Sequence, residues 1–198
     1  VTPILINSLG MGAYSYVGII TNILSFFTVL TYTLNSMVGR FYIYSYNNDK
    51  NLSDKYISSA LITCLSLAFV LLPILIIFSC KLDMLIKIDN NFVNDVKFAF
   101  FLSSVSFLLG TISSVFSTGA YCKNKLGVSN TVNIIANIFR VILVLLLFRF
   151  FDAHIWYMGI STIAQNFICI ILGYITFKKL IPEVKFSFFL FDINCARD

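Results

Sequence analysis

The sequence predicts an all-α, polytopic membrane protein, because of its composition, its long apolar blocks and the scarcity of its charged residues. Of the 198 residues, 59% are hydrophobic and 12% are charged, and the mean hydropathy is +0.90. Soluble domains average about 45–50% apolar and about 25% charged residues, and a domain of this size cannot bury such an excess of apolar surface. The composition therefore excludes a soluble enzyme, a secreted disulfide scaffold and a disordered tail.

Five apolar blocks are long enough to cross a bilayer, since a helix that rises 1.5 Å per residue needs about 20 residues to cross about 30 Å of hydrocarbon. Ahead of them, Val1–Leu9 is apolar but too short to cross, and we expect it to be the end of a sixth helix. We therefore expect residues 1–198 to form a single transmembrane lobe, a fragment of a larger protein. The five blocks are Ala13–Met37, Tyr56–Phe78, Phe98–Ser117, Asn130–Phe148 and Ile155–Phe177.

The basic residues of the loops predict the orientation. One set of alternate loops carries eight Lys and Arg residues and the other carries four, which places the first set in the cytoplasm. The net charge of +5 is spread thinly, without the dense patch that nucleic-acid binding requires. In the outer set, Lys81–Lys97 alternates charged and apolar residues, which predicts an interfacial helix. The cytoplasmic set is Arg40, Lys50, Lys55, Lys123, Lys125, Lys178, Lys179 and Lys185.

Every predicted span carries polar or small residues at steps of three and four, which is one face of a helix. Such a face either packs helices closely or lines a water-filled cavity. Packing is favoured for the serine and glycine rows of the second and third spans, because small residues let backbones approach. A cavity is favoured where the side chains are too polar for routine packing, namely Asn130, Asn133, Asn137 and Arg140 in the fourth span and Gln165 in the fifth.

Arg140 is the most costly residue, because an arginine at the middle of a span costs about 2.5–3.5 kcal/mol on insertion. None of the nine acidic residues lies well inside a span to neutralise it. It either reaches toward the interface and backbone carbonyls, or faces water and an anionic ligand, whose phosphate oxygens its planar fork would suit. Arg40, at the cytoplasmic surface, is either an interface anchor or a contact for anionic headgroups at the cavity mouth.

The sequence contains no recognisable catalytic or cofactor motif. It has no glycine-rich phosphate loop, no paired carboxylates within a span and one histidine, His154, which we interpret as an interface residue. The five cysteines form no C-x-x-C pair and no metal-ligand spacing. We therefore predict that the chain is not an enzyme and that it holds no cofactor and no metal.

Several short motifs, in this order, resemble the Wzx-type flippases of the multidrug/oligosaccharidyl-lipid/polysaccharide exporter superfamily. Pro3–Tyr14 resembles the end of that family's first helix and the turn after it, although Tyr14 is followed by Ser15 where the family has glycine. Asn35 to Arg40 resembles the end of the second helix. Asn137 and Arg140 resemble the polar fifth helix, and Lys178–Pro182 with Phe191-Asp192 resembles the linker after the sixth.

The resemblance implies an N-terminal lobe of a two-lobed carrier in the bacterial inner membrane, which requires its C-terminal lobe and flips a polyprenyl-pyrophosphate-linked oligosaccharide for surface polysaccharide biosynthesis. No nucleic-acid partner is expected. Two alternatives remain open: a multidrug-type exporter of the same superfamily, and a non-transporting membrane assembly partner whose polar rows only pack helices. We expect the pyrophosphate to meet Arg140, and the candidate substrate-binding residues are Arg140, Asn137, Asn133, Asn35, Gln165 and Arg40.

Overall fold

The computed structural model describes residues 6, 9–48, 50–151 and 153–184, apart from the side chains of residues 30–38, 47–48 and 50–52. Five helices within these residues are long and apolar enough to cross a membrane, which confirms the predicted all-α polytopic fold. Most of Val1–Leu9, expected to end a sixth helix, lies outside the described residues. The helices are α2 (Met11–Asn48), α3 (Lys50–Cys80), α4 (Leu82–Leu85), α5 (Val93–Cys122), α6 (Leu126–Phe150) and α7 (Tyr157–Leu180).

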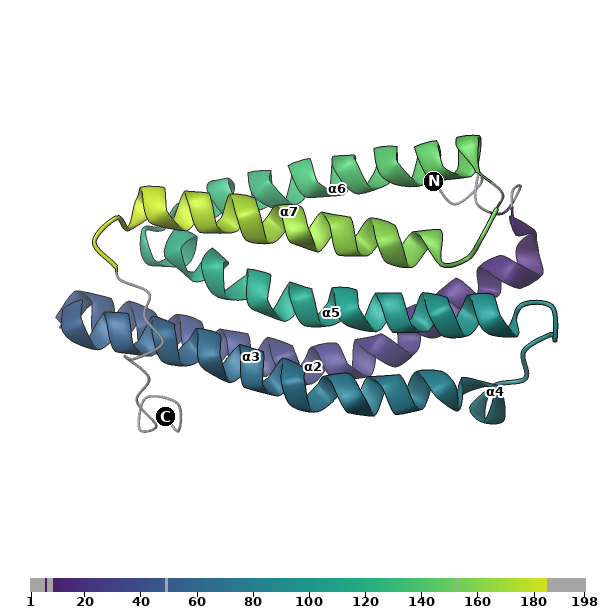
Figure 1. The fold of residues 1–198 in the computed structure, drawn as a ribbon. Helices are drawn as coiled ribbons and strands as arrows, with labels where there is room; N and C mark the ends of the chain where they lie inside the picture. The colour runs from purple at the N-terminus through teal and green to yellow at the C-terminus, as the bar shows by residue number, and fades with distance from the viewer. Residues whose placement is uncertain (1–5, 7–8, 49, 152, 185–198) are drawn as a thin grey trace.

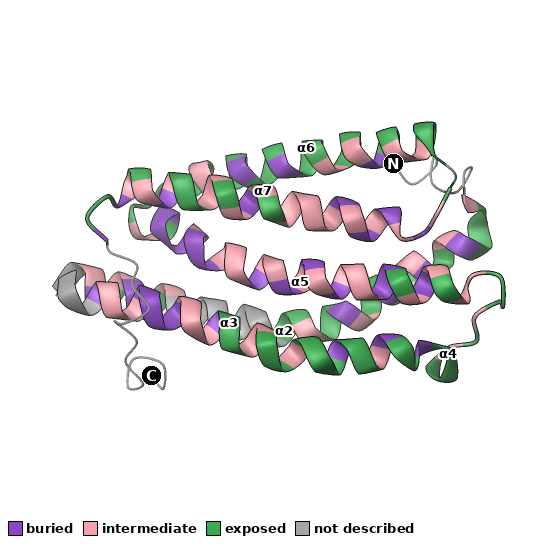
Figure 2. Ribbon diagram, in the orientation of Figure 1, coloured by how far each residue is buried: buried purple, intermediate pink, exposed green. Residues whose placement is uncertain are grey.

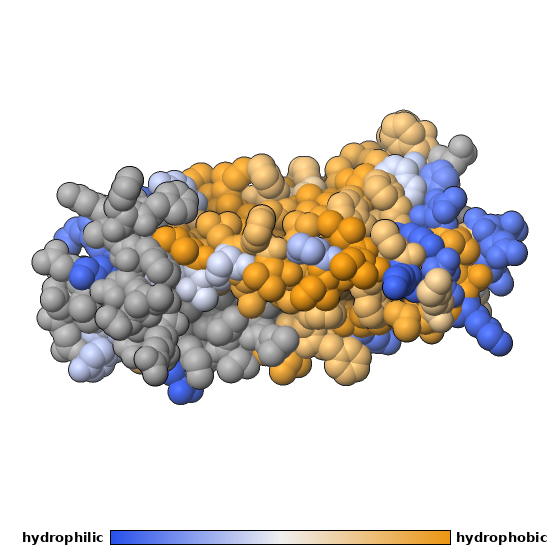
Figure 3. All heavy atoms as spheres, turned by 60° about the horizontal axis from the view of Figure 1, so that its bottom comes forward, coloured by the Kyte–Doolittle hydropathy of each residue, from blue (hydrophilic) through white to orange (hydrophobic). Residues whose placement is uncertain are grey.

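Helix α5 is the centre of the bundle. It packs against α2 and α3 on one side and against α7 on the other, and α6 packs mainly on α7 (Figure 1). In its most apolar stretch 39% of the residues are buried, against at most 17% in the other four spans, and Figure 2 shows the same contrast between α5 and the outward face of α3. On the face drawn in Figure 3, the described residues in the middle of the bundle are mostly apolar, as a surface in contact with lipid must be.

Two apolar clusters, one toward each end of the bundle, hold α5 to its neighbours. The outer cluster joins Tyr16 of α2 and Leu75 of α3 to Phe100 of α5. The inner cluster, at the predicted cytoplasmic end, includes Tyr42 of α2 and Phe177 of α7, whose rings lie 6.1 Å apart. Each end of α5 is thus fixed by packing independently of the other.

Glycines allow α5 and α7 to approach closely. A Cβ atom at Gly159 would lie 2.5 Å from the Cβ of Leu102, and one at Gly119 would lie 2.6 Å from the ring of Phe177. Real Cβ atoms do not approach other atoms so closely, so the contact requires the absence of a side chain at both positions.

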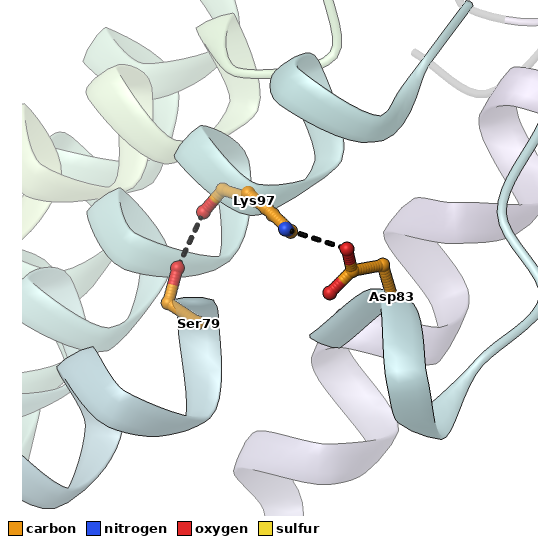
Figure 4. A network of polar contacts seen from close by, with 3 residues as sticks. All are labelled: Ser79, Asp83 and Lys97. Carbon is orange, nitrogen blue, oxygen red and sulfur yellow. Dashed lines mark hydrogen bonds and ion pairs between the residues drawn. The ribbon is translucent and has the colours of Figure 1, made fainter. Parts of the chain in front are cut away.

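The outer connection between α3 and α5 differs from the predicted interfacial helix. Its helical part is limited to α4, Leu82–Leu85, and α5 begins at Val93. The Asp89-Asn90-Asn91 sequence favours a turn, and the Phe92 N–H donates to the Asp89 carbonyl at 2.8 Å. Lys97 lies on α5, where its Nζ is 2.9 Å from Asp83 Oδ2 and its carbonyl accepts the Ser79 hydroxyl at 2.8 Å (Figure 4).

Candidate functional site

The position of Arg140 around the axis of α6 directs its side chain toward α7. Val132, Ala136 and Val144, at steps of four or eight, are the buried residues of α6, and α6 packs mainly on α7. Arg140 continues this line of residues and is itself half-buried. Residues four apart lie on one face of a helix, so the guanidinium faces the interior of the bundle and not the lipid.

Arg140 is brought to residues of three other helices. Its Nη1 donates a long hydrogen bond, 3.4 Å, to Oε1 of Gln165 on α7. It also lines a small cavity of about 40 Å³, here called the outer pocket, together with Thr21 of α2, Ser103 of α5 and Thr162 of α7. Arg140 and Gln165, two of the predicted substrate-binding residues, therefore belong to one local group, to which α2 contributes. The other lining residues are Val17, Ile20, Ala99, Ile155 and Met158.

The charge of Arg140 has little compensation from the protein. Among the described residues it makes the single hydrogen bond to Gln165, and none of them forms an ion pair with it. A guanidinium carries five N–H donors and remains charged at every accessible pH. Most of its donors thus have no partner among the described residues, and the outer pocket itself, at about 40 Å³, has room for about one water molecule.

A second cavity, of about 200 Å³, lies between the inner halves of α5, α6 and α7, and is here called the inner pocket. Asn130 and Asn133 of α6 line it, and the Sγ of Cys169 on α7 lies 3.7 Å from Oδ1 of Asn133. None of its lining residues is charged, and most are polar or small. They are Ser113, Ser114, Phe116, Ser117, Ala120, Tyr121, Ser129, Asn130, Val132, Asn133, Cys169, Gly173, Thr176 and Leu180.

The serine and glycine row of α5, for which the sequence favoured packing, both packs against α7 and lines the two pockets. At its middle, Nδ2 of Asn166 donates to the carbonyl and the hydroxyl of Ser106, at 2.8 and 2.9 Å, and the same side chain lies against Gly110. These residues pack α5 on α7. Ser103 lines the outer pocket, and Ser113 and Ser117 line the inner one. Sequence reasoning did not assign the packing role to Asn166.

Two predicted residues lie apart from this group. Asn137 is exposed on α6 and lines neither pocket. Arg40 is exposed, and it follows Thr21 by 19 residues, or about 28 Å along α2, so it does not reach Arg140. The side chain of Asn35 lies outside the described residues. Within the described chain no cluster of His, Cys, Asp and Glu is suited to bind a metal ion.

Two contacts that the sequence did not predict join distant segments at the two ends of the bundle. At the inner end, Lys123 Nζ donates to the Tyr46 hydroxyl at 2.7 Å and lies 4.7 Å from the centre of that ring. This hydrogen bond raises the pKa of Lys123. At the outer end, His154 Nδ1 lies 2.9 Å from Asp95 Oδ2. The sequence separations of 77 and 59 residues explain why no local pattern reveals them.

Comparison with known proteins gives one relative. The chain is 28% identical, over 194 residues, to the uncharacterized membrane protein EpsK of Bacillus subtilis strain 168. The match covers 98% of this chain but only 38% of that protein. No model of a known protein family and no solved structure matches the chain. Together with the five apolar helices, this similarity identifies a multi-pass membrane protein.

Proposed function

We propose that this chain is the N-terminal lobe of a transporter in the bacterial inner membrane, which flips a polyprenyl-pyrophosphate-linked oligosaccharide for surface polysaccharide biosynthesis. The proposal depends on one observation above all. Near the middle of α6, the half-buried guanidinium of Arg140 faces the outer pocket, which residues of four helices line, and has no ion-pair partner among the described residues. An anionic headgroup would supply the missing charge, and arginine binds phosphate oxygens with two parallel hydrogen bonds.

The neutral groups near Arg140 support a carrier rather than a permanent anion site. Gln165 accepts a hydrogen bond from the guanidinium, and three hydroxyl residues line the same, otherwise largely apolar pocket; these groups can exchange hydrogen bonds with water or sugar hydroxyls. Secondary transporters bind their substrates near the midplane, between two repeats that rock against each other. The chain spans 38% of the length of its relative, which leaves room for a second lobe, and transport requires the full-length protein.

The test is Arg140→Gln in the full-length protein, produced in a host whose surface polysaccharide depends on it. Glutamine keeps hydrogen-bonding capacity but removes the charge, so we expect surface polysaccharide to be lost while the amount of protein in the membrane is unchanged. Arg149→Gln is the matched control, because Arg149 is exposed in the last turn of the same helix. Normal polysaccharide in Arg140→Gln refutes the proposal.

The same strains distinguish the alternatives. A multidrug-type exporter would leave polysaccharide intact and change the sensitivity of the cells to toxic compounds when Arg140 is replaced. A membrane assembly partner would show neither effect, and Arg140→Gln would then alter only the stability or the partners of the protein. Each result therefore supports a different one of the three functions.

A further inference from the structure

We propose that the inner pocket is a subsite for a neutral glycan, separate from the site where Arg140 meets the pyrophosphate. This inference rests on the proposed function and divides the substrate between two places. Asn133 precedes Arg140 by seven residues, which is about 10 Å along α6 toward the cytoplasmic end. One lipid-linked headgroup can thus contact both pockets, with its pyrophosphate at Arg140 and its sugars at Asn133.

The hydrogen-bonding groups of the inner pocket select the chemistry of the ligand. The hydroxyls of Ser114, Ser117 and Thr176 donate to carbonyls of their own helices, at 2.7, 2.6 and 2.9 Å. Their oxygens remain as acceptors, which suits a ligand rich in O–H donors. The amides of Asn130 and Asn133 can both donate and accept. A neutral, polyhydroxylated group satisfies this combination, whereas a phosphate has no protons to offer to the acceptors.

Volume and surface character point to a sugar. About 200 Å³ equals the volume of about six or seven water molecules in the liquid, far more than one ion or one water occupies. Phe116 and Tyr121 add aromatic surface to the lining, and Tyr121 is 55% exposed. Aromatic rings offer apolar faces to a ligand, as the C–H face of a sugar requires, while a tyrosine hydroxyl stays available for hydrogen bonds.

The test measures binding to the purified full-length protein in lipid nanodiscs, with two probes. One is bare polyprenyl pyrophosphate, and the other is the same lipid carrying a disaccharide of N-acetylhexosamine. We expect the wild type to bind the glycosylated probe more tightly. Asn133→Leu and Ser117→Ala should each lower the ratio of the two affinities by about three- to tenfold, as expected for the loss of hydrogen-bonding groups.

The matched control for Ser117→Ala is Ser66→Ala. The Ser66 hydroxyl also donates to a carbonyl three residues earlier, at 2.8 Å, but it is exposed on α3, away from both pockets. It should leave the affinity ratio unchanged. Free disaccharide serves as a competitor, because a soluble glycan offers the pocket the same hydroxyl groups as the lipid-linked one. If it displaces the glycosylated probe when both are present at equal concentration, the assignment to a lipid-linked glycan is overturned.

The outcomes separate the two proposals. Equal affinity of the wild type for both probes, or an unchanged ratio in both pocket variants, overturns the glycan subsite and leaves the proposed function standing. Failure of the wild type to bind either probe, or binding of the bare probe that does not weaken in Arg140→Gln, overturns the proposed function, and the subsite with it.

Discussion

The closest approach of α5 and α7 makes Gly159→Ala the sharpest test of the fold. The added Cβ would lie 2.5 Å from Leu102 Cβ and 3.4 Å from the Ala99 carbonyl oxygen. Both atoms of the tighter contact are Cβ atoms, so no change of rotamer relieves it and the two backbones must separate. Overpacking of this kind costs about 1–3 kcal/mol, against a gain of about 0.5–1 kcal/mol from replacing glycine within a helix.

We therefore expect Gly159→Ala to lose up to about 2.5 kcal/mol, which corresponds to a fall in Tm of up to about 10 °C for a chain of this size. Thermal unfolding of the purified protein in detergent, followed by circular dichroism, measures it. Gly127→Ala is the control, since a Cβ there has no atom within 4 Å, and its Tm should equal or exceed that of the wild type. A Gly159→Ala protein as stable as Gly127→Ala would refute the close packing of α5 on α7.

Two further predictions concern the outer brace and the exposed face of α6. The Lys97 side chain holds the pKa of Asp83 below its ordinary value of 3.8. This ion pair therefore stabilises the fold above pH 3.8, and the stabilisation is lost as the pH falls through the lowered pKa. The difference in Tm between the wild type and Asp83→Asn should shrink over the same fall in pH, and a difference that stays constant argues against the ion pair. Asn137 belongs to the polar row of α6 that the sequence predicts to face water. In the full-length protein, Asn137→Cys should therefore react with a charged, water-soluble maleimide faster than Ile138→Cys, whose position is 55% exposed on another face of α6. Equal rates would mean that Asn137 does not face water.

The five spans could be predicted because the requirement for about 20 apolar residues is a property of the bilayer and not of tertiary contacts. The ends of the helices could not. Helix α2 continues to Asn48, eleven residues beyond the predicted end at Met37. Hydropathy marks only the part of a helix that lies in lipid, and the more polar residues from Gly39 onward continue the helix beyond it while Tyr42 packs in the inner cluster.

Periodicity identified the polar faces but not their partners. Ser106 and Ser113 belong to one row on α5, yet Asn166 binds the first and the inner pocket meets the second. Seven residues are about 10 Å along a helix, enough for one face to pass from helix packing to a cavity. Whether a residue of this row packs against a helix or lines a cavity depends on the neighbouring helix, so the periodicity of α5 alone cannot predict it.

Arg140 and Asn137 show the same limit at finer scale. The sequence placed them in one row, but three residues turn a helix by about 300°, and the structure directs Arg140 to the packing face of α6 while Asn137 remains exposed. On that face an apolar residue would continue the line of Val132, Ala136 and Val144 and avoid the cost of about 2.5–3.5 kcal/mol of inserting an arginine. Among the described residues, only one long hydrogen bond, to Gln165, offsets this cost. Residues that break local rules without a structural gain are characteristic of functional sites, which is why we place the binding of the anion at Arg140 rather than at the more accessible Asn137.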